Sequence, residues 1–576
     1  MKFSSTLSSD GTGGPDATAS PSTGASEAPV AGPSSTSDIY SDAEVEKDGI
    51  ILALDTAVAS LLEGKGKGKE KEAHFKPLEG KAMQPRVGKQ TVVVSQGTLL
   101  DRSFRPLKDV QKARKKHIPQ LAHGLNEVLR REGVHWLRDP ETQKYNFPEY
   151  LENIPRVEDF AFDRLPGFTP SSRDMGFVAS VKQAGCRFAG STSSLTGILT
   201  QIYLLLSEEK SINISDLSAE FDKAPRFFTP GQRIPTSVIL LYQNGIYTTD
   251  YDGERDSSDP EEIILLPLGT LLEKFLTLPK AQFDTFLKSN TSGQHPKLTD
   301  VHRYAKYGNF LMRSQLDCYD KSLPGTGVFD LKTRAISAIR HDVYNYLNYI
   351  DHNIESLRGR EGSFESEYYD MIRSAFLEYS FQARIGNMDG VLVAYHNTAR
   401  IFGFQYISLR EMDRCLFGRE DAGDRVFLRC VALMEILYEH ITNCFPRQSV
   451  KVTFEKRSTV VRAWVEPLEV DGGEPPVVEL QLHLQNIMHG RAAKGSYVIY
   501  ADYPWTVQYR IERNVEDQAT ILRNRDRAYK RQMSIAKSLP TTQEGSEGDA
   551  EVLEETFGVS DPAQSQSTVL VDEGTV

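Results

Sequence analysis

The sequence predicts a mixed α/β protein, and three observations support this class. Short runs rich in β-branched and aromatic residues alternate with amphipathic stretches of helical period. The composition is that of a globular protein, with 39% hydrophobic and 25% charged residues. The two ends are instead rich in small, polar or acidic residues, which bury too little apolar area to offset the entropy lost on ordering. We therefore expect a folded body over about residues 100–537, with interleaved strands and helices.

Composition divides the chain into four parts. Residues 1–100 are rich in Ser, Gly, Pro and Ala, and we expect them to be disordered. Their one apolar patch, Ile50–Leu54, is a candidate docking helix. We expect residues 101–185 to form a helical and extended segment, and residues 186–537 to form an α/β core with C-terminal extensions. Residues 538–576 read as a disordered acidic tail.

Charge and cysteine usage narrow the class of protein. The net charge is −12, but residues 538–576 hold nine acids and no Lys or Arg, so the remainder carries only −3. A nearly neutral body leaves room for local basic patches. The five cysteines are scattered without a CxxC pair, which disfavours a disulfide framework or a zinc site.

No apolar run approaches the ~18 residues of a membrane-spanning helix. The first residues resemble neither a secretory signal nor a transit peptide, so the residues alone indicate an intracellular, soluble protein.

The first two expected helices cover 109–131 and 188–210, where apolar residues recur at helical spacing. The basic run KARKKH (112–117) in the first helix is either a solvated face or a phosphate-contacting patch. The second helix begins with small and hydroxylated residues, and one of Ser191–Ser193 is a natural N-cap.

Strands and helices alternate in the remainder. Thr236–Tyr242 and Gly245–Asp252 are β-rich runs joined by a turn at Gln243-Asn244. Further β-rich runs are 310–319, 327–335, 390–397, 399–407, 449–456, 459–466 and 476–485. Further helical patterns are 267–278, 335–350, 366–385, 410–417, 424–445 and the strongly basic 518–537.

Three charged side chains are expected to converge on one hairpin. Asp330 and Lys332 are two residues apart on one strand, so both point to the same face. Asp317 ends the preceding run, and the Leu-Pro-Gly-Thr-Gly sequence between them favours a reversal of the chain. If the two strands pair, Asp317 lies beside Asp330.

Such a site suits phosphodiester chemistry. Two carboxylates held close together repel unless a cation lies between them. Mg²⁺ binds through one or two carboxylates and leaves room for substrate phosphate; it lowers the pKa of bound water. Lys332 can orient that water or counter the charge on the phosphate. The other interpretation is a surface strand with a cross-strand salt bridge.

Longer strings around these residues carry a family resemblance. Together they resemble the PD-(D/E)XK nuclease superfamily and, more specifically, the fungal mitochondrial petite ("Pet") RNA-processing family. That family is linked to 5′-end processing and 5′-to-3′ decay of mitochondrial transcripts. The resemblance covers roughly 115–535, and its strings are Leu121–Phe147, Gly190–Ser207, Leu268–Thr277, Tyr307–Asp320 and Gly325–Ala335.

The resemblance implies a nuclease-like mixed sheet flanked by helices, with family-specific insertions. It implies that Asp317 and Asp330 are ligands of Mg²⁺ or Mn²⁺ and that Lys332 is the catalytic lysine. The superfamily usually adds an acid on a helix before the first core strand. The candidates here are Gln201 and, on a later helix, Glu273; each is equally an ordinary structural polar residue.

A 5′-end-dependent exonuclease must also hold a terminal phosphate. Arg187, followed by Ser191, Thr192 and Ser193 at a helix start, offers the hydroxyls and free N–H groups that an anion favours. Plain N-capping is the alternative.

Polar residues beside the carboxylates are expected to contact the RNA backbone. Arg313 and Gln315 alternate onto the face of Asp317, and Arg334 follows Lys332. Tyr379 and Arg373 are the candidates on a helix that resembles the superfamily's Q-x-x-x-Y pattern, with the glutamine missing; core packing is the other interpretation of Tyr379.

The function that the resemblance implies is a metal-dependent 5′-to-3′ exoribonuclease that acts on mitochondrial mRNA and rRNA precursors. The alternative is a non-catalytic RNA-surveillance adaptor that stimulates a helicase–exonuclease complex (the degradosome) or the mitochondrial RNA polymerase. A DNA-repair nuclease is a third class, because nothing in the sequence reads a 2′-hydroxyl. The resemblance implies a mitochondrial matrix protein at the periphery of the inner membrane, and the basic 518–537 helix suits RNA, an anionic membrane surface or plain solvation.

Overall fold

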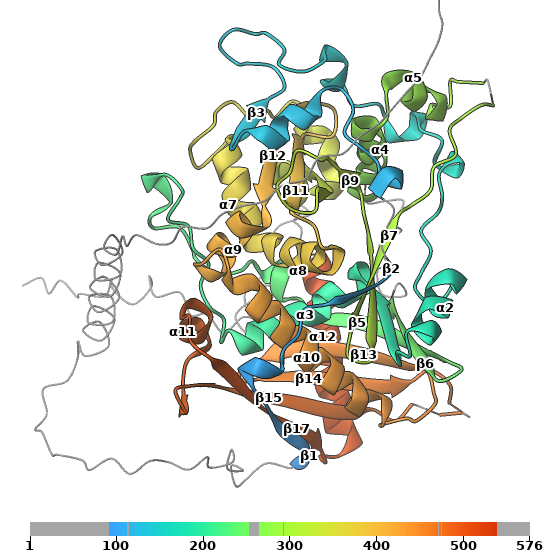
Figure 1. The fold of residues 1–576 in the computed structure, drawn as a ribbon, viewed down its shortest axis with the longest axis vertical. Coiled ribbons are helices and arrows are strands. Elements are labelled where there is room, and N and C mark those ends of the chain that lie inside the picture. The colour runs from blue at the N-terminus through green and yellow to red at the C-terminus, as the bar shows by residue number, and fades with distance from the viewer. Residues whose placement is uncertain are drawn as a thin grey trace, which may run out of the picture. The chain divides into compact units, whose positions relative to one another are not determined.

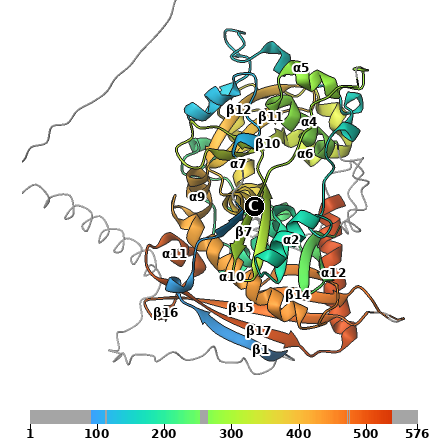
Figure 2. The same ribbon diagram turned by 45° about the vertical axis from the view of Figure 1, so that its right-hand side comes forward.

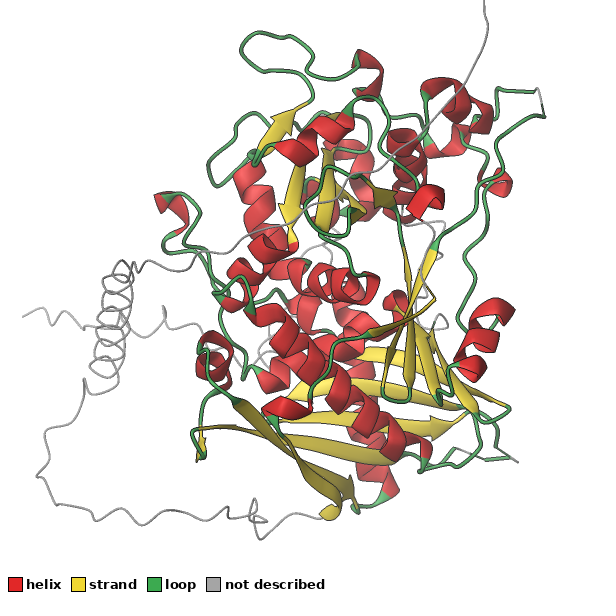
Figure 3. Cartoon of the chain, viewed as in Figure 1, coloured by secondary structure: helices red, strands yellow, loops and turns green. Residues whose placement is uncertain are grey.

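The computed structural model describes residues 91–111, 115–252, 264–291, 293–470, 472–473 and 475–537. All of these belong to one compact unit. Strands and helices interleave along them (Figure 3), which confirms the mixed α/β class with helices flanking a mixed sheet. The patch Ile50–Leu54 and the acidic tail lie outside the described residues.

The larger sheet holds twelve strands among the described residues (Figure 1), in the order β1-β17-β15-β14-β13-β5-β6-β4-β8-β7-β2, with β16 beside β15. Along this order the neighbours are antiparallel, except that β4 is parallel to both β6 and β8. The strands are β1 Thr91–Leu99, β2 Lys108–Gln111, β4 Phe188–Ser191, β5 Thr236–Gln243, β6 Ile246–Tyr251, β7 His302–Tyr307, β8 Phe310–Gln315, β13 Val450–Arg457, β14 Val460–Pro467, β15 Val478–Met488, β16 Arg491–Ala492 and β17 Trp505–Asn514.

The smaller sheet has five strands in the described part of the chain, in the order β3-β12-β11-β10-β9. Strand β10 is parallel to β11, whereas the other neighbours are antiparallel. This sheet carries the candidate site, because Asp330 and Lys332 lie on β10. The strands are β3 Val134–Trp136, β9 Cys318–Tyr319, β10 Val328–Ala335, β11 Gly390–His396 and β12 Ile401–Ser408.

Helices fill the space between the two sheets and cover the outer face of the smaller one. Helix α8, which is labelled between the two sheets in Figure 1, contacts β8 of the larger sheet and β11 of the smaller sheet, so it joins them. Figure 2 shows β10, β11 and β12 of the smaller sheet above β14, β15 and β17 of the larger one. Helix α4 packs on β10, where Phe329 and Leu331 lie in the same buried cluster as Leu271 and Phe275. The main helices are α2 Met175–Gln183, α3 Thr192–Leu206, α4 Leu265–Thr277, α5 Lys280–Phe283, α6 Ser337–His341, α7 Phe364–Ser374, α8 Phe376–Gly386, α9 Leu409–Phe417, α10 Ala422–Thr442, α11 Gly495–Tyr500 and α12 Gln518–Lys537.

The pattern of alternating faces on β10 is as the sequence predicts. Phe329 and Leu331 point toward α4, so Asp330 and Lys332 point toward α8 on the other face. The expected strands at 236–242 and 245–252 and the expected helix at 267–278 are confirmed as β5, β6 and α4. None of the helices in the described part is both long and apolar enough to cross a bilayer.

Two N-terminal expectations are wrong. Residues 91–99, expected to be disordered, form β1 and pair with β17. The single helix expected over 109–131 is instead strand β2, which pairs with β7, followed by short 3₁₀ turns, the last at Leu125–Arg130. Pro119 cannot donate a helical hydrogen bond, and Gly124 has a φ of +75°, so one continuous helix is interrupted twice.

Three further elements are divided or displaced. The single strand expected over 310–319 is two strands, because β8 ends at Gln315 in the larger sheet and β9 belongs to the smaller one. The helix expected over 366–385 breaks at Ala375, whose φ of −141° is not helical. The hairpin turn falls at Asn244-Gly245, where both residues have positive φ, one residue later than expected.

Candidate functional site

Asp317 and Asp330 are brought together by a short ladder. Strand β9 pairs antiparallel with β10, with Cys318 opposite Phe329. The backbone N–H of Leu331 donates to Asp317 Oδ2 at 3.2 Å, which fixes the Asp317 carboxylate beside β10. The turn before β10 needs a glycine, because Gly327 has a φ of +82° and a Cβ there would lie 2.7 Å from the Asp320 carbonyl oxygen. The expected pairing of the two runs is confirmed in this short form.

Lys332 joins the pair from the same face of β10. Its Nζ lies 2.5 Å from Asp330 Oδ2 and donates to Gln382 Oε1 at 2.9 Å. Gln382 Nε2 in turn lies 3.4 Å from Asp330 Oδ1. The ammonium also lies 5.2 Å from the centre of the Tyr379 ring, a cation–π distance. The three groups therefore form a connected network between β10 and α8.

Burial and neighbouring charges shift the pKa values of Asp317 and Lys332. Burial raises the pKa of the Asp317 carboxyl group well above its usual value, and the charge of neighbouring Asp330 raises it further. Burial alone would lower the pKa of Lys332, but Asp330 and Asp317 outweigh it and raise that pKa. Lys332 is therefore a fixed positive charge, and Asp317 is the group whose ionisation is disfavoured.

A third acid comes from helix α4. Glu273 accepts from Lys274 Nζ at 2.6 Å, and its charge contributes to the raised pKa of Asp317. Its side chain is about 20% exposed, so it is open to water on one side. We refer to Glu273, Asp317, Asp330, Lys332 and Gln382 as the carboxylate cluster.

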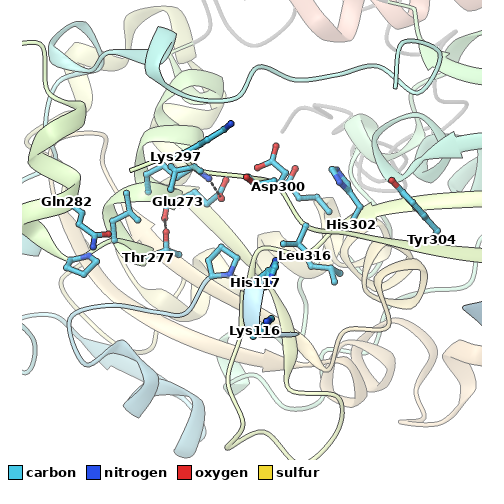
Figure 4. A pocket seen from close by; sticks show the side chains of 18 residues that line it. Lys116, His117, Glu273, Thr277, Gln282, Lys297, Asp300, His302, Tyr304 and Leu316 are labelled. Carbon is cyan, nitrogen blue, oxygen red and sulfur yellow. Dashed lines mark hydrogen bonds and ion pairs between the residues drawn. The ribbon is translucent and has the colours of Figure 1, made fainter. Parts of the chain in front are cut away.

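A pocket of about 760 Å³ opens beside the cluster (Figure 4). Glu273 and Thr277 of α4 lie on its wall, as do His302 and Tyr304 of β7 and Gln315 of β8. Its other charged and imidazole groups are mostly basic, namely Lys116, His117, Lys274 and Lys297, with Asp300 the other acid. The two members of the expected KARKKH patch that line the pocket are Lys116 and His117, whereas 112–114 lie outside the described residues.

The donor set fits a hard divalent cation of the Mg²⁺ kind. Asp330 Oδ2 is buried and makes no hydrogen bond of good geometry, although Lys332 Nζ lies beside it. Within the described ranges, no three His, Cys, Asp or Glu side chains already converge as a closed metal site. Mg²⁺ needs only one or two carboxylates and keeps several waters, so the pair Asp317 and Asp330, with Glu273 nearby, is sufficient.

The other phosphate-binding candidates near the carboxylates lie in different environments. Gln315 lines the pocket beside the cluster. Arg313 lies in a different environment from Gln315. It is 4% exposed, its Nη1 lies 2.6 Å from Asp174, and its Nη2 donates to the Thr169 carbonyl. Arg334 is buried between Glu367 and Asp370, which also bind Arg340. Arg334 therefore ties β10 to α7, and both arginines have acidic partners within the fold.

The candidates at the start of α3 lie around strand β4 of the larger sheet. Arg187 pairs with Glu439 and Thr442 of α10 and stacks on Phe188. Ser191 is the N-cap, as expected, but its Oγ contacts Ser193 Oγ at 2.8 Å and makes no capping bond, and Thr192 begins the helix. Among the described residues, no hydrogen bond or ion pair joins this group to the carboxylate cluster.

Gln201 is placed as a structural residue. Its Nε2 donates to the Ile234 carbonyl at 2.8 Å, and its Oε1 accepts from the Lys456 N–H at 2.7 Å. Both polar ends are satisfied by backbone, and the residue is 1% exposed. Of the two helix-borne candidates, the structure therefore brings Glu273 and not Gln201 to the cluster.

Gln382 is the site residue that sequence reasoning missed. The expected order on the helix was glutamine before tyrosine, whereas here Tyr379 precedes Gln382 by three residues. Residues three apart on a helix share a face, so the reversed pattern still presents both groups to Lys332. The signal was present as Tyr-x-x-Gln.

A family model and two relatives that match this chain carry the same name, Pet127. The Pet127 family, described as mitochondrial protein Pet127, matches residues 168–439. The mitochondrial mRNA degradation protein pet127 of Schizosaccharomyces pombe is 42% identical over 341 residues, which cover 59% of this chain and 65% of that protein. The putative mitochondrial translation system component PET127 of Saccharomyces cerevisiae is 39% identical over 324 residues, which cover 53% of this chain and 38% of that protein. The chain thus spans less than two thirds of the length of each relative.

Similar solved structures include two Rai1 proteins. Rai1 of Scheffersomyces stipitis has a TM-score of 0.32 and 12% identity, over 62% of this chain and 94% of that chain. Rai1 of Candida albicans, solved with pU5 and Mn²⁺, has a TM-score of 0.30 and 10% identity, over 60% of this chain and 90% of that chain. Likeness at this level leaves the chemistry to the chain's own residues. Residues 168–439 match the Pet127 family model, and this matched region contains the whole carboxylate cluster.

Proposed function

We propose that this chain hydrolyses phosphodiester bonds of RNA with the help of a divalent cation, Mg²⁺ or Mn²⁺. The observation that carries the proposal is the convergence of Asp317, Asp330 and Lys332 beside an open, mainly basic pocket. The names of the two relatives, a mitochondrial mRNA degradation protein and a mitochondrial translation component, are consistent with an RNA substrate.

Asp317 and Asp330 would hold the cation, with Glu273 as a further oxygen donor. When bound, a divalent cation polarises the phosphoryl oxygen and lowers the pKa of its water. The raised pKa of Asp317 supports this assignment, because a nearby positive charge is what would restore its ionised form.

The chain's own groups supply the remaining chemistry. Lys332 stays protonated, so it would stabilise negative charge that develops on the phosphate and would not act as a base. Gln382 holds that ammonium by its amide oxygen. Lys116, Lys297 and the other basic groups of the pocket would contact the RNA backbone.

The direction of digestion and the cellular setting belong to the same proposal. We propose that the enzyme trims 5′ ends of mitochondrial transcripts in the 5′-to-3′ direction, in the mitochondrial matrix at the periphery of the inner membrane. A helicase–exonuclease complex or the mitochondrial RNA polymerase is the expected partner. Helix α12 offers Arg523, Arg527 and Lys530 as an exposed basic stripe, whereas Arg525 and Arg531 pair with acids of the sheet.

The test is digestion of end-labelled, 5′-monophosphorylated RNA with Mg²⁺, Mn²⁺ or EDTA. We expect Asp330→Asn and Lys332→Ala to slow hydrolysis by on the order of 10²-fold or more. Asp320→Asn is the matched control, because Asp320 lies on the same hairpin and its Oδ1 accepts from the Ser322 N–H in the turn. Equal rates for Asp330→Asn and wild type would refute the proposal. Label at the 5′ or the 3′ end separates the two polarities.

A non-catalytic RNA-binding adaptor is the second candidate. The close ion pair between Lys332 and Asp330 favours it, because that contact already neutralises one carboxylate. Metal-independent RNA binding with no turnover by the wild-type protein would decide for the adaptor. Matched RNA and DNA substrates in the same assay separate a ribonuclease from a deoxyribonuclease.

A further inference from the structure

The two most exposed large apolar side chains in the described part of the chain lie on one short segment. Phe168 is 77% exposed and Met175 is 76% exposed, and Arg173 between them is also exposed. Single exposed apolar residues are ordinary on a protein surface. Here, however, an aromatic ring, a thioether and a guanidinium group occur close together in the sequence. We refer to residues 168–175 as the surface segment.

Buried polar contacts hold the surface segment at both ends and in the middle. Arg313 of β8, which is 4% exposed, donates to the Thr169 carbonyl at 2.7 Å and to Asp174 Oδ2 at 2.6 Å. One guanidinium group therefore brings the two ends of the segment together. Between them, the backbone N–H of Ser172 donates to Asp250 Oδ1 at 3.2 Å, and its hydroxyl group donates to the same carboxylate. The exposed side chains thus extend from a fixed backbone, which lowers the ordering entropy that a ligand must offset.

The surface segment borders the pocket of about 760 Å³ beside the carboxylate cluster, which we call the basic pocket. Arg313 is paired with Tyr304 in the β7–β8 ladder, so the two side chains share a face of the sheet. Tyr304 lines the basic pocket, and its ring centre lies 5.3 Å from that of Phe177, two residues after Met175. Figure 4 shows Tyr304 at the end of the pocket away from Gln282. The surface segment therefore lies at the Tyr304 end.

The chemistry of the basic pocket indicates which partner fits beside it. Lys116 and Lys297 on its wall suit a polyanion. A single strand of RNA whose phosphates enter the pocket carries unpaired bases past its end, and every base offers a π face on which an aromatic ring can stack. A thioether also packs against aromatic rings, and a guanidinium group binds phosphate. The three exposed side chains of the surface segment therefore match the parts of an RNA strand.

We propose that the surface segment binds single-stranded RNA outside the basic pocket. Phe168 stacks on a base, Met175 packs against a base, and Arg173 contacts a backbone phosphate. Stacking does not depend on base identity, so this contact serves RNA of any sequence. The inference rests on the RNA substrate of the proposed function, but it requires no hydrolysis.

The test measures the binding of short, 3′-labelled, single-stranded RNA to the full-length protein in EDTA by fluorescence anisotropy. We expect Phe168→Ala to raise Kd about tenfold, the usual effect of losing one stacked base. Phe168→Trp should bind as tightly as wild type because it keeps an aromatic face, whereas Phe168→Leu should bind nearly as weakly as Phe168→Ala. Tyr500→Ala is the matched control, because Tyr500 is a 54% exposed aromatic residue on α11.

Salt dependence tests the phosphate contact separately. Arg173→Gln should reduce the slope of log Kd against log salt concentration by about 0.7, the value for one phosphate contact on a single strand. Phe168→Ala should leave that slope unchanged, because stacking releases no counterion.

Four results would overturn the proposal. They are a wild type that binds no single-stranded RNA, equal Kd for Phe168→Ala and wild type, full affinity in Phe168→Leu, and an unchanged salt slope in Arg173→Gln. Vesicles of anionic lipid that bind wild type but not Phe168→Ala, with RNA binding unaffected, would assign the segment to a membrane surface instead.

Hydrolysis separates this inference from the proposed function. Phe168→Ala should raise KM for RNA about tenfold and leave kcat at the wild-type value, because the ring lies outside the carboxylate cluster. An unchanged KM would count against the surface segment alone. A wild type that binds RNA through Phe168 but hydrolyses none fails the proposed function and leaves the RNA-binding segment established.

Discussion

Gln382 contacts both members of the ion pair formed by Lys332 and Asp330. Its Oε1 accepts from Lys332 Nζ at 2.9 Å, and its Nε2 lies 3.4 Å from Asp330 Oδ1. Because one rigid amide serves both groups, rotation of the Lys332 side chain away from β10 would break two contacts at once. Gln382 is therefore a positioning residue, and α8 controls the geometry of the site on β10.

The first prediction concerns this amide. Gln382→Leu removes both contacts at nearly constant volume, and we expect kcat for RNA hydrolysis to fall about 10- to 100-fold, the usual effect of losing such a supporting contact. KM should change little, because Gln382 is expected to hold Lys332 and not the RNA. Gln315→Leu, in the basic pocket, is the matched control and should raise KM instead. A Gln382→Leu enzyme with wild-type kcat would show that Lys332 needs no such support.

The second prediction concerns pH and Asp317. The folded pKa of Asp317 is raised by burial and by Asp330, so its contribution to stability is full below the unfolded pKa of ~3.9 and is lost as pH rises toward the folded pKa. In EDTA at pH 8, Asp317→Asn should therefore unfold about 1–3 °C above wild type. Near pH 4 the difference should be much smaller, because the Asp317 carboxyl group is then protonated in the folded state and about half protonated in the unfolded state. Thermal unfolding followed by circular dichroism measures it, and a less stable Asp317→Asn at pH 8 would contradict it.

The third prediction concerns the cation. A ligand that binds only the folded state adds about 2.7 kcal/mol of stability at 100 times its Kd. We expect Mg²⁺ and Mn²⁺ to raise the unfolding temperature of wild type at pH 8, and to leave that of Asp330→Asn unchanged. The Asp320→Asn control should respond as wild type does. An equal response of Asp330→Asn would place the cation away from the carboxylate cluster.

The local chemistry of the site could be predicted because it depends on short-range rules. The two-residue spacing of Asp330 and Lys332 fixes one face of a strand, and the Pro-Gly turn before β10 brings Asp317 to it. Both rules act within about twenty residues. The core strands and helices from 236 to 278 could be predicted for the same reason.

The contributions from distant segments could not be predicted in the same way. Glu273 and Gln382 reach the site only through the packing of α4 and α8 on β10. Arg313 was assigned to the face of Asp317 by strand alternation, which fails because the chain changes sheets at Leu316. The sequence does not indicate that Arg187 and Arg334 have acidic partners. Glu439 and Glu367 reach these two arginines through the tertiary structure. Whether a charged side chain can bind a phosphate thus depends on the partners that the fold gives it.

The last prediction concerns a buried arginine far from the proposed chemistry. The Arg429 guanidinium lies 4.4 Å and 4.1 Å from the rings of Phe104 and Trp505, donates to the Trp505 carbonyl and pairs with Asp101. It therefore anchors the segment after β1 to α10. Arg429→Lys keeps the charge but loses the planar stacking, so we expect the free energy of unfolding to fall by about 1–3 kcal/mol. Urea unfolding measures this, with the exposed Arg523→Lys as the matched control. Hydrolysis per folded molecule should stay at the wild-type rate, because the loss acts on the anchoring of the N-terminal segment and leaves Lys332 and its partners in place.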